Sequence, residues 1–524
     1  MSLFETVGKK SIKIFICSFA FFGLVVIASQ CFAQSGASTS DQQMTSRQYM
    51  QQLYSVFDFV ERNYVEEVEP KVLFEGAMRG LLNSLGDQFS YYLDAESMTS
   101  MNDTTVGNFG GVGLSITKEV KSTSDKPAYV EVVAAIEDTP GAKAGIQTGD
   151  LITSINSTDT ATISMNEVLS LLRGPVGTTV SFVIKRGEME LPFTITRALI
   201  EVQTVKYTMI DKTGYLRIIE FTPQTAVRVK EALSSFKKSG YTSLIVDLRN
   251  NPGGILTAAE EIADMFMDSG VIVSTKSRIQ SENKVKFASS KNTIVPKGLP
   301  VVILIDHNSA SCSEVLTGAL KDAKIAYLVG ETSYGKGSVQ LVIPIPPGDI
   351  GIRLTISKYY SPSDSNIHGI GIPPDLEIKN VDVSEDLQVA FQNLVKADVI
   401  KPYVASHPNM SEKDIEKYAK ELHKTYPLDL RFLRRIIRVQ VYHAKEMPLY
   451  DKDYDEQLTK ALEIVNGGNF AKLIEKTKTL KEIEVERLAV ERLAVDSLAG
   501  DSLADDSLSD GNTDSEKSAS KDKQ

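Results

Sequence analysis

The stretch VVILIDHNSASCSEVLTGAL, residues 301–320, contains a strand pattern, a turn and a helix pattern in immediate succession. The apolar, β-branched run from Val301 to Ile305 follows a proline and predicts a buried strand. From Glu314 onward the apolar residues recur at helical spacing, which places Ser311 at the turn between strand and helix. Backbone N–H groups of a first helical turn are free there, and they can bind a capping side chain or an oxyanion. Ser311 is therefore a candidate nucleophile as well as a candidate helix cap.

Strand and helix patterns alternate on both sides of this stretch, which indicates a layered α/β core. In such a core, functional residues gather at strand ends. Two glycine-containing segments follow predicted strands: RNNPGG, residues 249–254, and GETSYGKGSVQ, residues 330–340. The expected strands are 215–219, 244–248 and 326–329, and the expected helix between the first two is 224–238.

The chain has 524 residues and the composition of a globular protein, 42% hydrophobic and 24% charged. Of its net charge of −11, residues 481–524 contribute −6 through twelve acidic and six basic residues. From residue 486 to 510 this segment repeats every five residues, a period that gives neither a helix nor a strand a single buried face. We expect residues 481–524 to be a disordered acidic tail. The rest of the chain is only mildly acidic, which argues against nucleic-acid binding.

Residues 1–33 have the pattern of an export signal. Three lysines precede the apolar stretch 14–28, and residues 31–33 fit a cleavage site. The apolar stretch is short for a membrane span, so cleavage is favoured over anchoring through residues 14–28. A lipid-modified Cys31 is less favoured because Gln30 is a poor neighbour for it. The protein is therefore expected to be exported, most simply to the periplasm.

Residues 106–195 contain a glycine-rich loop at 110–114, the segment TPGAKAGIQTGDLITSIN at 139–156, and a capping box formed by Ser164 and Glu167. Together these features resemble a PDZ domain. The resemblance implies that loop amides bind the C-terminal carboxylate of a peptide that adds as a strand, so protein substrates with apolar C-termini are the expected partners. The alternative is a small β-rich spacer without a ligand. The implied peptide-binding residues are Gly111, Val112, Gly113 and Leu114.

The parts needed for acyl transfer are a nucleophile, a base and amide donors for the oxyanion. Ser311 could supply the first, Lys336 in its glycine-flanked turn the second, and the Gly253-Gly254 segment the third. A lysine acts as a base only when it is largely neutral, which requires burial or positive surroundings. Gln340 could orient the amine by a hydrogen bond. Taken alone, Lys336 would be read as a solvated loop lysine.

SASCSE at 309–314, Lys336 twenty-five residues after Ser311, DLRNNPGG at 247–254 and the PDZ-like region resemble the C-terminal processing peptidases, or tail-specific proteases. The resemblance runs from about residue 50 to about residue 380. It implies an α/β protease core with the layered ClpP/crotonase-like fold, an inserted PDZ domain and helical regions at both ends. It also implies an exported serine endopeptidase that recognises the C-terminal tails of its substrates and cuts upstream of them, without a metal or cofactor.

The same resemblance assigns roles to individual residues. It makes Ser311 the nucleophile, Lys336 the general base and Gln340 its orienting partner. The lysine spacing of the family selects Ser311 rather than its neighbours Ser309 and Ser313. The oxyanion donors would be the amide of Cys312, where the family usually has a small residue such as alanine, and that of Gly253 or Gly254. A further hypothesis comes from the short helix expected to end near Arg173, and not from the resemblance: Arg173, in the RGPVGT turn, is a candidate for coupling peptide binding to the active site.

Two alternatives remain from the residues themselves. A Ser/His/Asp triad would use His307 or His368 as the base, with Asp247 or Asp306 as its partner. An exported PDZ adaptor with an inert protease-like core would belong to another class of protein. Metal catalysis is not indicated, because the sequence has no HExxH motif and no His/Cys cluster.

Helical patterns at both ends of the chain are candidate surfaces for homo-oligomer formation, and an adaptor protein of unspecified identity is a further candidate partner. The expected organisation is a signal peptide (1–33), an N-terminal helical region (34–105), the PDZ domain (106–195), the serine protease core (196–385), a C-terminal helical region (386–480) and the acidic tail (481–524).

Overall fold

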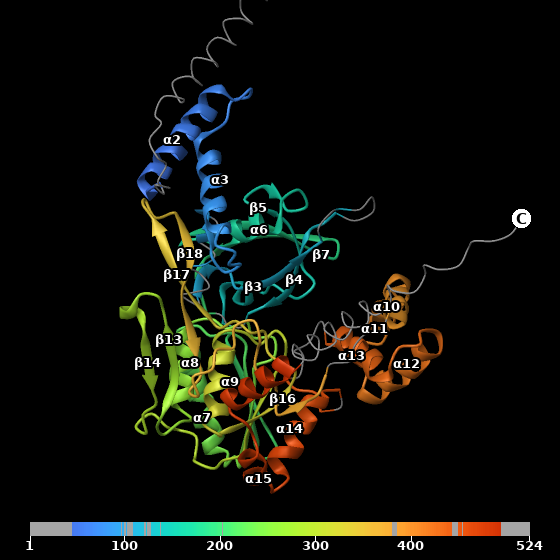
Figure 1. Ribbon diagram of the computed structural model, residues 1–524. Helices are drawn as coiled ribbons and strands as arrows, with labels where there is room; N and C mark the ends of the chain where they lie inside the picture. Colours follow the sequence, from blue (N-terminus) through green and yellow to red (C-terminus); the bar gives the residue numbers. More distant parts are fainter. Residues whose placement is uncertain are drawn as a thin grey trace, which may run out of the picture. The chain divides into compact units, whose positions relative to one another are not determined.

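The computed structural model describes residues 44–493 except 96, 99–100, 102–107, 120–121, 123–126, 137, 202, 380–384, 443–448 and 453 (Figure 1). The expected signal at 1–33, the anchor at 14–28 and the tail beyond residue 493 lie outside the described residues. Within the described ranges, none of the helices combines the length and apolar character of a membrane span. The chain divides into two compact units, residues 1–81 and 82–524.

The first unit contributes a pair of helices, α2 (Ser46–Asn63) and α3 (Pro70–Asn83). Helix α2 begins with a capping box, in which the Thr45 N–H donates to Gln48 Oε1 (2.8 Å) and the Gln48 N–H donates to Thr45 Oγ1 (3.4 Å). None of its residues is buried, and the side chains of Tyr54 and Phe59 are exposed. An N-terminal helical region was expected at 34–105, and its second helix, α3, ends at Asn83.

Residues 91–93 form a strand, β1 (Tyr91–Leu93), so the N-terminal region is not helical throughout. The chain turns at Gly86 in the left-handed conformation (φ 64°), and Tyr91 then pairs antiparallel with Arg353. This strand belongs to a sheet of the second unit.

A small β domain follows, with its own apolar core formed by residues such as Val132, Ile152, Val168 and Phe182. Its strands are ordered β3-β4-β5-β7-β8, with β6 beside β5, and β2 pairs with β9 where the chain enters and leaves the domain. The pairing of β2 with β9 extends the domain to residue 201, beyond the expected limit of 195, which falls within β8. The elements are β2 (Asn108–Gly111), β3 (Leu114–Lys118), β4 (Val130–Ala135), α5 (Pro140–Lys143), β5 (Leu151–Ile155), β6 (Thr158–Asp159), α6 (Met165–Leu172), β7 (Thr179–Arg186), β8 (Met189–Thr196) and β9 (Ala198–Glu201).

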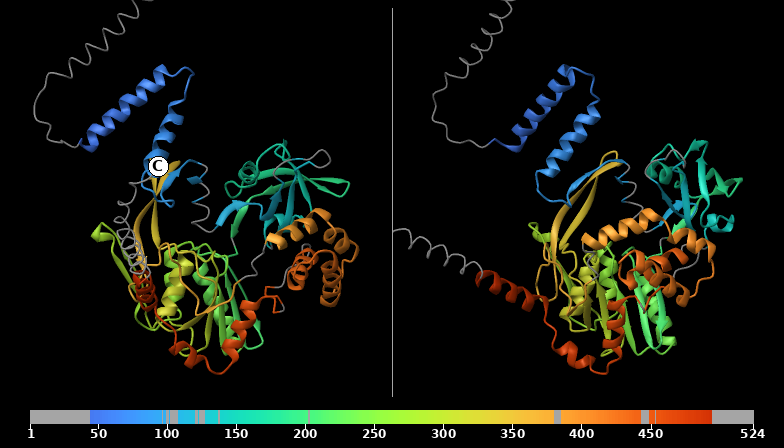
Figure 2. Two further views of the ribbon diagram at one scale, coloured as in Figure 1. Left: turned by 45° about the vertical axis from the view of Figure 1, so that its right-hand side comes forward. Right: turned by 90° about the vertical axis from the view of Figure 1, so that its right-hand side faces the viewer.

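The core of the second unit is a six-stranded sheet in the order β10-β11-β12-β15-β16-β19, parallel except for the β10–β11 pair. Alternate side chains of its central strands face opposite sides, as a strand requires. Ile303 belongs to an apolar cluster with residues of helices α7, α8 and α9, whereas Val302 and Leu304 belong to a cluster with residues of α14 (Glu456–Asn466). Figures 1 and 2 show the backbone of this sheet and of the helices that cover it. The elements are β10 (Val205–Ile210), β11 (Thr213–Ile218), α7 (Thr225–Lys238), β12 (Ser243–Asp247), α8 (Leu256–Asp264), β15 (Val301–Ile305), α9 (Cys312–Asp322), β16 (Ala326–Gly330) and β19 (Leu376–Glu377).

A second, antiparallel sheet has the order β1-β18-β13-β14, with β17 also paired to β18. Strand β17 continues directly from the loop that holds Lys336, and β18 returns beside it. The sheet therefore carries residues that are distant in sequence toward that loop. Its remaining elements are β13 (Val271–Lys276), η1 (Gln280–Glu282), β14 (Lys284–Phe287), β17 (Ser338–Ile345) and β18 (Ile350–Tyr360).

The C-terminal helical region is not one block. Helices α10 to α13 have a separate apolar core that includes Ile415, Leu433 and Ile437. Helices α14 and α15 instead cover the core sheet through residues such as Leu458 and Phe470. The bounds are α10 (Glu385–Ala397), α11 (Ile400–Ser406), α12 (Glu412–Thr425), α13 (Leu430–Val441), α14 (Glu456–Asn466) and α15 (Phe470–Glu475).

Residues 480–493 also form a helix, so the first part of the expected disordered tail is ordered. Thr479 and Glu482 form a capping box at its start, with the Thr479 N–H donating to Glu482 Oε2 (2.8 Å) and the Glu482 N–H donating to Thr479 Oγ1 (3.3 Å). Leu480 is buried in the main core. Ile483, one turn further on, packs against the same core. The cap and these two apolar contacts explain why order continues past the predicted boundary.

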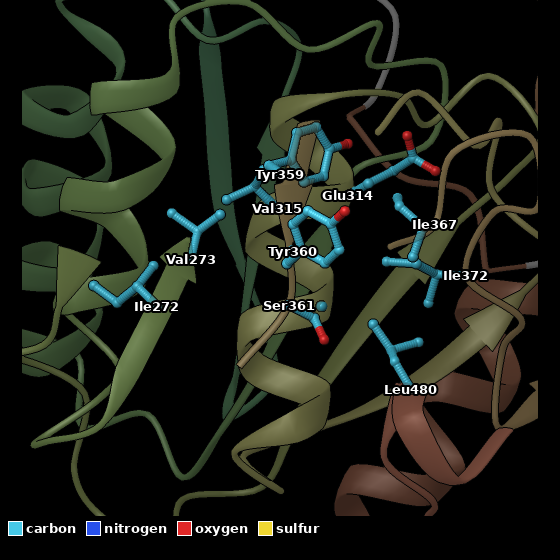
Figure 3. A pocket seen from close by; sticks show the side chains of 11 residues that line it. Ile272, Val273, Glu314, Val315, Tyr359, Tyr360, Ser361, Ile367, Ile372 and Leu480 are labelled. Carbon is cyan, nitrogen blue, oxygen red and sulfur yellow. The ribbon is translucent and has the colours of Figure 1, made fainter. Parts of the chain in front are cut away.

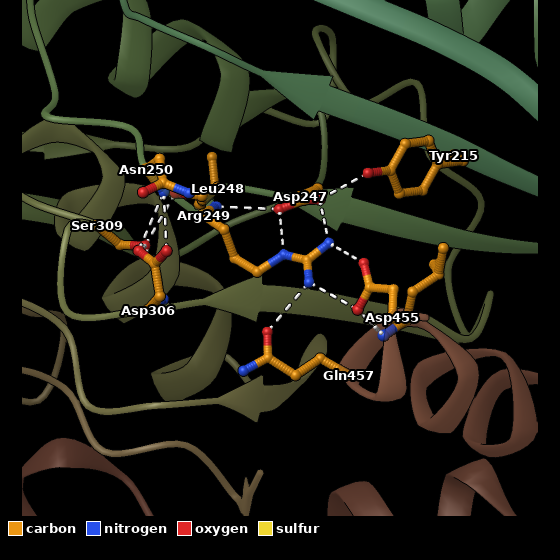
Figure 4. A network of polar contacts seen from close by, with 10 residues as sticks. Tyr215, Asp247, Leu248, Arg249, Asn250, Asp306, Ser309, Asp455 and Gln457 are labelled. Atoms are coloured by element: carbon orange, nitrogen blue, oxygen red, sulfur yellow. Dashed lines mark hydrogen bonds and ion pairs between the residues drawn. The ribbon is translucent and has the colours of Figure 1, made fainter. Parts of the chain in front are cut away.

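A buried polar network joins α14 to the end of β12 (Figure 4). The guanidinium of Arg249 donates to both carboxylate oxygens of Asp247 (2.9 and 2.6 Å) and of Asp455 (2.8 and 2.7 Å). Tyr215 donates its hydroxyl proton to Asp247 (2.6 Å). Burial is the largest single influence and acts to raise the pKa of Asp247, but the charges of Arg249 and Arg217 and the hydrogen bonds from Arg249 and Tyr215 together outweigh it, and the pKa lies below its usual value. This carboxylate therefore stabilises the fold above the usual aspartate range, and its contribution is lost as the pH falls below that range.

Arg249→Ala should lower the free energy of unfolding by about 3–5 kcal/mol, because it leaves two carboxylates without their cation. Denaturant unfolding at neutral pH, followed by circular dichroism, measures this change. Lys460→Ala is the control: it removes an exposed ion pair with Glu463 and should cost at most about 0.5 kcal/mol. Equal effects of the two substitutions would contradict this account of the network.

Candidate active site

Ser311 lies between β15 and α9, as the sequence predicts. Hydrogen bonds to the Asp306 carboxylate hold the turn in place. The Asp306 carboxylate accepts a hydrogen bond from the N–H group of Asn250 (Figure 4). It also accepts one from the N–H group of Asn308. Ser311 itself has φ 55° and ψ −113°, a strained conformation for a residue with a side chain. Strain of this kind persists only where the surroundings impose it, and it is common at functional turns.

The three serines of the turn differ in exposure. The Ser309 hydroxyl is buried and donates to the Leu248 carbonyl (2.8 Å), and the buried Ser313 hydroxyl donates to the Asn251 carbonyl (3.0 Å). Ser311 is half-buried. The two neighbours therefore hold the turn against the segment after β12, and Ser311 is the serine that solvent reaches.

The glycine pair after β12 approaches the turn closely. A Cβ atom on Gly253 would lie 2.7 Å from Ser311 Cβ, so only glycine fits at this position. The Gly253 N–H donates to Asn251 Oδ1 (2.9 Å) and is therefore occupied. Within the described part of the chain, the N–H groups of Gly254 and Cys312 donate no hydrogen bond. Of the two glycines considered from the sequence, Gly254 is thus the one with an available amide.

Lys336 lies in the loop between β16 and β17, with glycines on both sides as predicted. A Cβ atom on Gly335 would lie 2.8 Å from the Gly371 N atom, so the loop backbone packs tightly on the segment before β19. Burial, helped by the positive charge of Arg353, lowers the pKa of Lys336, as a lysine base requires. Its amine lies 5.1 Å from the centre of the Phe89 ring.

Two expected contacts of Lys336 are not formed in this conformation. Among the described residues, no hydrogen bond joins Lys336 Nζ to Ser311 Oγ or to Gln340. Gln340 instead donates to Ser338 Oγ (2.9 Å) and accepts from Arg353 (3.3 Å). Neither Arg353 nor Phe89 was found from the sequence, because strand pairing and not a local motif brings them to the loop.

Histidine does not replace lysine in this arrangement. The His307 side chain is 70% exposed and faces Glu331 (3.4 Å). In the described ranges no hydrogen bond joins His307 or His368 to Ser311, and the carboxylates of Asp247 and Asp306 are engaged by other groups. The same ranges contain no group of three His, Cys, Asp or Glu side chains that could hold a metal ion.

The predicted peptide-binding loop of the β domain lies between β2 and β3. The Val112 carbonyl accepts from the Gly141 N–H (2.7 Å), which ties the loop to α5. Gly113 adopts φ 77°, and a Cβ atom there would lie 2.2 Å from Thr139 Cβ. Gly111 ends β2 and Leu114 begins β3, so the loop is the turn between two strands.

Arg173 follows α6, where its guanidinium lies 4.4 Å from the centre of the Phe109 ring on β2. It therefore contacts the strand that leads directly into the peptide-binding loop. Ser164 and Glu167 form the predicted capping box at the start of α6, with the Ser164 N–H donating to Glu167 Oε2 (2.7 Å).

A half-buried serine that solvent reaches, on a strained strand-to-helix turn beside unoccupied amides and a lysine of lowered pKa, is typical of serine enzymes that transfer acyl groups. Comparison with known proteins specifies the class. Family models match residues 212–378 (Peptidase family S41), 131–186 (PDZ domain) and 15–97 (Activating protease CtpB N-terminal domain).

Relatives of known identity agree with these matches. The carboxy-terminal-processing protease of Bartonella bacilliformis is 37% identical over 364 residues, which cover 68% of this chain and 81% of the relative. The carboxy-terminal processing protease CtpB of Bacillus subtilis is 30% identical over 439 residues, covering 79% and 88%. The solved structure of a photosystem II D1 C-terminal processing protease matches at 27% identity with a TM-score of 0.38, covering 66% of this chain and 96% of that one.

The chain belongs to peptidase family S41, among its carboxy-terminal-processing proteases with a PDZ domain, and it is a serine-type peptidase. The predicted family, the PDZ domain and the peptidase activity are confirmed. An adaptor with an inert core is correspondingly disfavoured.

The thiol of Cys312 should be unreactive in the folded enzyme. Burial raises its pKa to about 12, and its Sγ donates to the Gly254 carbonyl (3.1 Å). Relative to a free cysteine, the reactive thiolate fraction at neutral pH should fall about a thousandfold. In a variant with Cys17→Ser and Cys31→Ser, a colorimetric thiol reagent should label Cys312 only after denaturation. Rapid labelling of the native enzyme would contradict the buried position of this side chain.

Proposed function

We propose that Ser311 attacks the scissile carbonyl while neutral Lys336 takes the hydroxyl proton. The amides of Gly254 and Cys312 then stabilise the negative charge that forms on the carbonyl oxygen. The protonated lysine gives its proton to the leaving amine as the acyl-enzyme forms. Water then attacks the ester while Lys336 takes a proton from it, and Lys336 returns this proton to the Ser311 oxygen as the acid product leaves. The observation that carries this proposal is the contact of Gly253 with Ser311, which brings the two available amides to the nucleophile.

The dyad has to close before this chemistry begins. Lys336 lies against the Phe89 ring, and Gln340 is hydrogen-bonded to Arg353. We propose that rotation of the Lys336 side chain toward Ser311 forms the catalytic hydrogen bond, with Gln340 then orienting the amine. In this proposal the observed arrangement is the resting one, and the lowered pKa of Lys336 already favours its neutral form.

The PDZ domain would bind the substrate and hold it near the active site. Its loop amides at 112–114 would bind the C-terminal carboxylate of a protein with an apolar tail, and the tail would extend the sheet as a strand. Arg173, which contacts the strand before this loop, is the proposed link between peptide binding and activation. The enzyme would be exported by the segment at residues 1–33, act in the periplasm or another extracytoplasmic space, and form homo-oligomers through terminal helices such as α2, whose apolar side chains are exposed.

Two further parts of the proposal come from the family resemblance: the fold of the core and a partner protein. The core is assigned the ClpP/crotonase-like layered fold, and an adaptor protein is a candidate partner. The carboxy-terminal processing named for the relatives is proposed as the reaction of this chain on its own substrates.

Ser311→Ala should abolish cleavage of a folded protein that carries an unstructured apolar C-terminal tail, because it removes the attacking hydroxyl. Ser313→Ala is the matched control, since it removes a neighbouring hydroxyl that bonds only to a backbone carbonyl. Gel analysis of the digestion products distinguishes the two. Activity that survives in Ser311→Ala would refute the assignment of the nucleophile.

The pH profile should report Lys336. The limb of kcat/KM that rises with pH should lie below the ordinary lysine pKa of about 10.4, because the neutral base is favoured earlier. Arg353→Gln removes a neighbouring positive charge, so the Lys336 pKa should rise and the limb should move to higher pH. Arg353→Lys keeps the charge and should leave the limb near its original position. If the rising limb has the same position in Arg353→Gln as in wild type, the assignment of Lys336 as the base is wrong.

Arg173→Ala should reduce the stimulation of cleavage by an added apolar C-terminal peptide. Lys143→Ala removes an exposed positive charge from the same domain and should preserve the stimulation. Cleavage rates with and without peptide, measured on a substrate that lacks an apolar tail, provide the comparison. Unchanged activity and unchanged peptide dependence in Arg173→Ala would exclude the proposed link.

A further inference from the structure

Glu314 is a buried carboxylate that the proposed chemistry does not use. Its side chain projects from the first turn of α9, and the residue is 1% exposed. In the described part of the chain it forms no ion pair, so N–H and O–H donors alone compensate its charge. Burying an unpaired carboxylate is costly, and its retention at this position needs a reason.

The donors to Glu314 come from both halves of the catalytic site. Oε2 accepts from the backbone N–H groups of Ser311 (2.8 Å) and Lys336 (2.8 Å). Oε1 accepts from the Ser333 hydroxyl (2.6 Å) and the Gly335 N–H (2.7 Å). A helix cap accounts only for the bond to Ser311. The other three bonds fasten the loop of the base to the turn of the nucleophile.

Tyr359 completes the arrangement from β18. Its hydroxyl hydrogen-bonds to the carbonyl oxygen of Lys336 and lies 3.2 Å from the carbonyl oxygen of Ser311. Burial raises the pKa of Tyr359 well above its usual value, so the hydroxyl stays protonated and acts as a donor. Glu314 thus holds the N–H groups of the two catalytic residues, and Tyr359 holds their carbonyl groups.

The surroundings of this pair are apolar. Glu314 and Tyr359 line a small pocket together with Val315, Ile367 and Ile372 (Figure 3). In such surroundings hydrogen bonds are stronger than in water, and a donor without an acceptor is expensive. The positions of the two catalytic backbones are therefore fixed relative to one another while the Lys336 side chain remains able to rotate.

We propose that Glu314 and Tyr359 are positioning residues that set the separation of the nucleophile and the base in the catalytic state. This inference rests on the Ser311–Lys336 dyad proposed above. Small errors of position are costly to catalysis: a displacement of about 1 Å can reduce the rate about a hundredfold. A carboxylate with two oxygens, each accepting two bonds, holds the two segments in a way that an amide cannot reproduce.

Glu314→Gln should lower kcat about ten- to a hundredfold with KM changed by less than about twofold, because the NH2 group cannot accept two of the four hydrogen bonds. Tyr359→Phe should lower kcat in the same way, and the double variant should lose less than the product of the single losses, since both residues hold the same two backbones. Unfolding midpoints are measured in parallel. Asp264→Asn and Tyr418→Phe are the matched controls.

The controls remove equivalent buried groups away from the site. Asp264 accepts from the Ser289 N–H and the Asn292 amide, and the Tyr418 hydroxyl donates to the Val399 carbonyl. We expect them to lower the unfolding midpoint while kcat stays within about twofold of wild type. If Glu314→Gln and Tyr359→Phe lower kcat no more than these controls, or if their losses simply multiply, the positioning role is overturned.

A pH profile of kcat/KM distinguishes the effect of the Glu314 charge on Lys336 from the effect of lost hydrogen bonds. Burial and the positive charge of Arg353 lower the pKa of Lys336, whereas Cys312, Glu314 and Asp87 raise it. Glu314→Gln should therefore move the rising limb of kcat/KM to lower pH, whereas Tyr359→Phe removes no charge and should not. An unmoved limb in Glu314→Gln would contradict the placement of this carboxylate beside the base.

Lys336→Ala distinguishes a failure of the positioning role from a failure of the dyad. An active Lys336→Ala enzyme would overturn the dyad and the positioning role together. An inactive Lys336→Ala enzyme, combined with unimpaired kcat in Glu314→Gln and Tyr359→Phe, would overturn the positioning role alone.

Discussion

The parallel pairing of β12 with β15, and of β15 with β16, determines where every catalytic component lies. Asp247 is in register with Leu304, and Ile305 with Gly330, so the three strands end at one edge of the sheet. The loops that follow them contain the glycine pair, the proposed nucleophile Ser311 and the proposed base Lys336. The packing of both faces fixes the register of a buried parallel sheet. The register in turn fixes the positions of these loops relative to one another along the strand direction, independently of the contacts between the loops.

The sequence predicted this part of the molecule well because its signals are local. The apolar run at 301–305, the helical spacing after Ser311 and the glycines around Lys336 each depend on a few neighbouring residues. The sequence did not show which backbone amide of the glycine pair is free to bind an oxyanion. Which amide is available depends on the side chain of Asn251, whose Oδ1 occupies the N–H of Gly253. No spacing rule contains that information.

The remaining contributors could not have been predicted, because sheet pairing brings them from distant segments. Arg353 reaches Gln340 because β18 pairs with β17, and Tyr359 reaches the same loop from the end of β18. Antiparallel pairing of this kind leaves only alternation in the sequence, which reveals a strand but not its partner. The same limit explains why β1 was not expected: it joins a sheet through its pairing with Arg353 and its neighbours. The helix from residue 480 was missed for another reason, because Leu480 and Ile483 pack against a core formed by distant segments.

The ion pair between Arg249 and Asp455 also makes one end of the core depend on the other end of the chain. The two residues are separated by 206 positions. Without α14, one face of the core sheet has no cover, and the cation just before the glycine pair lacks one of its two carboxylates. A truncation that ends before α14 therefore removes support from the edge of the sheet that carries the proposed site, although it leaves every residue of that site in place.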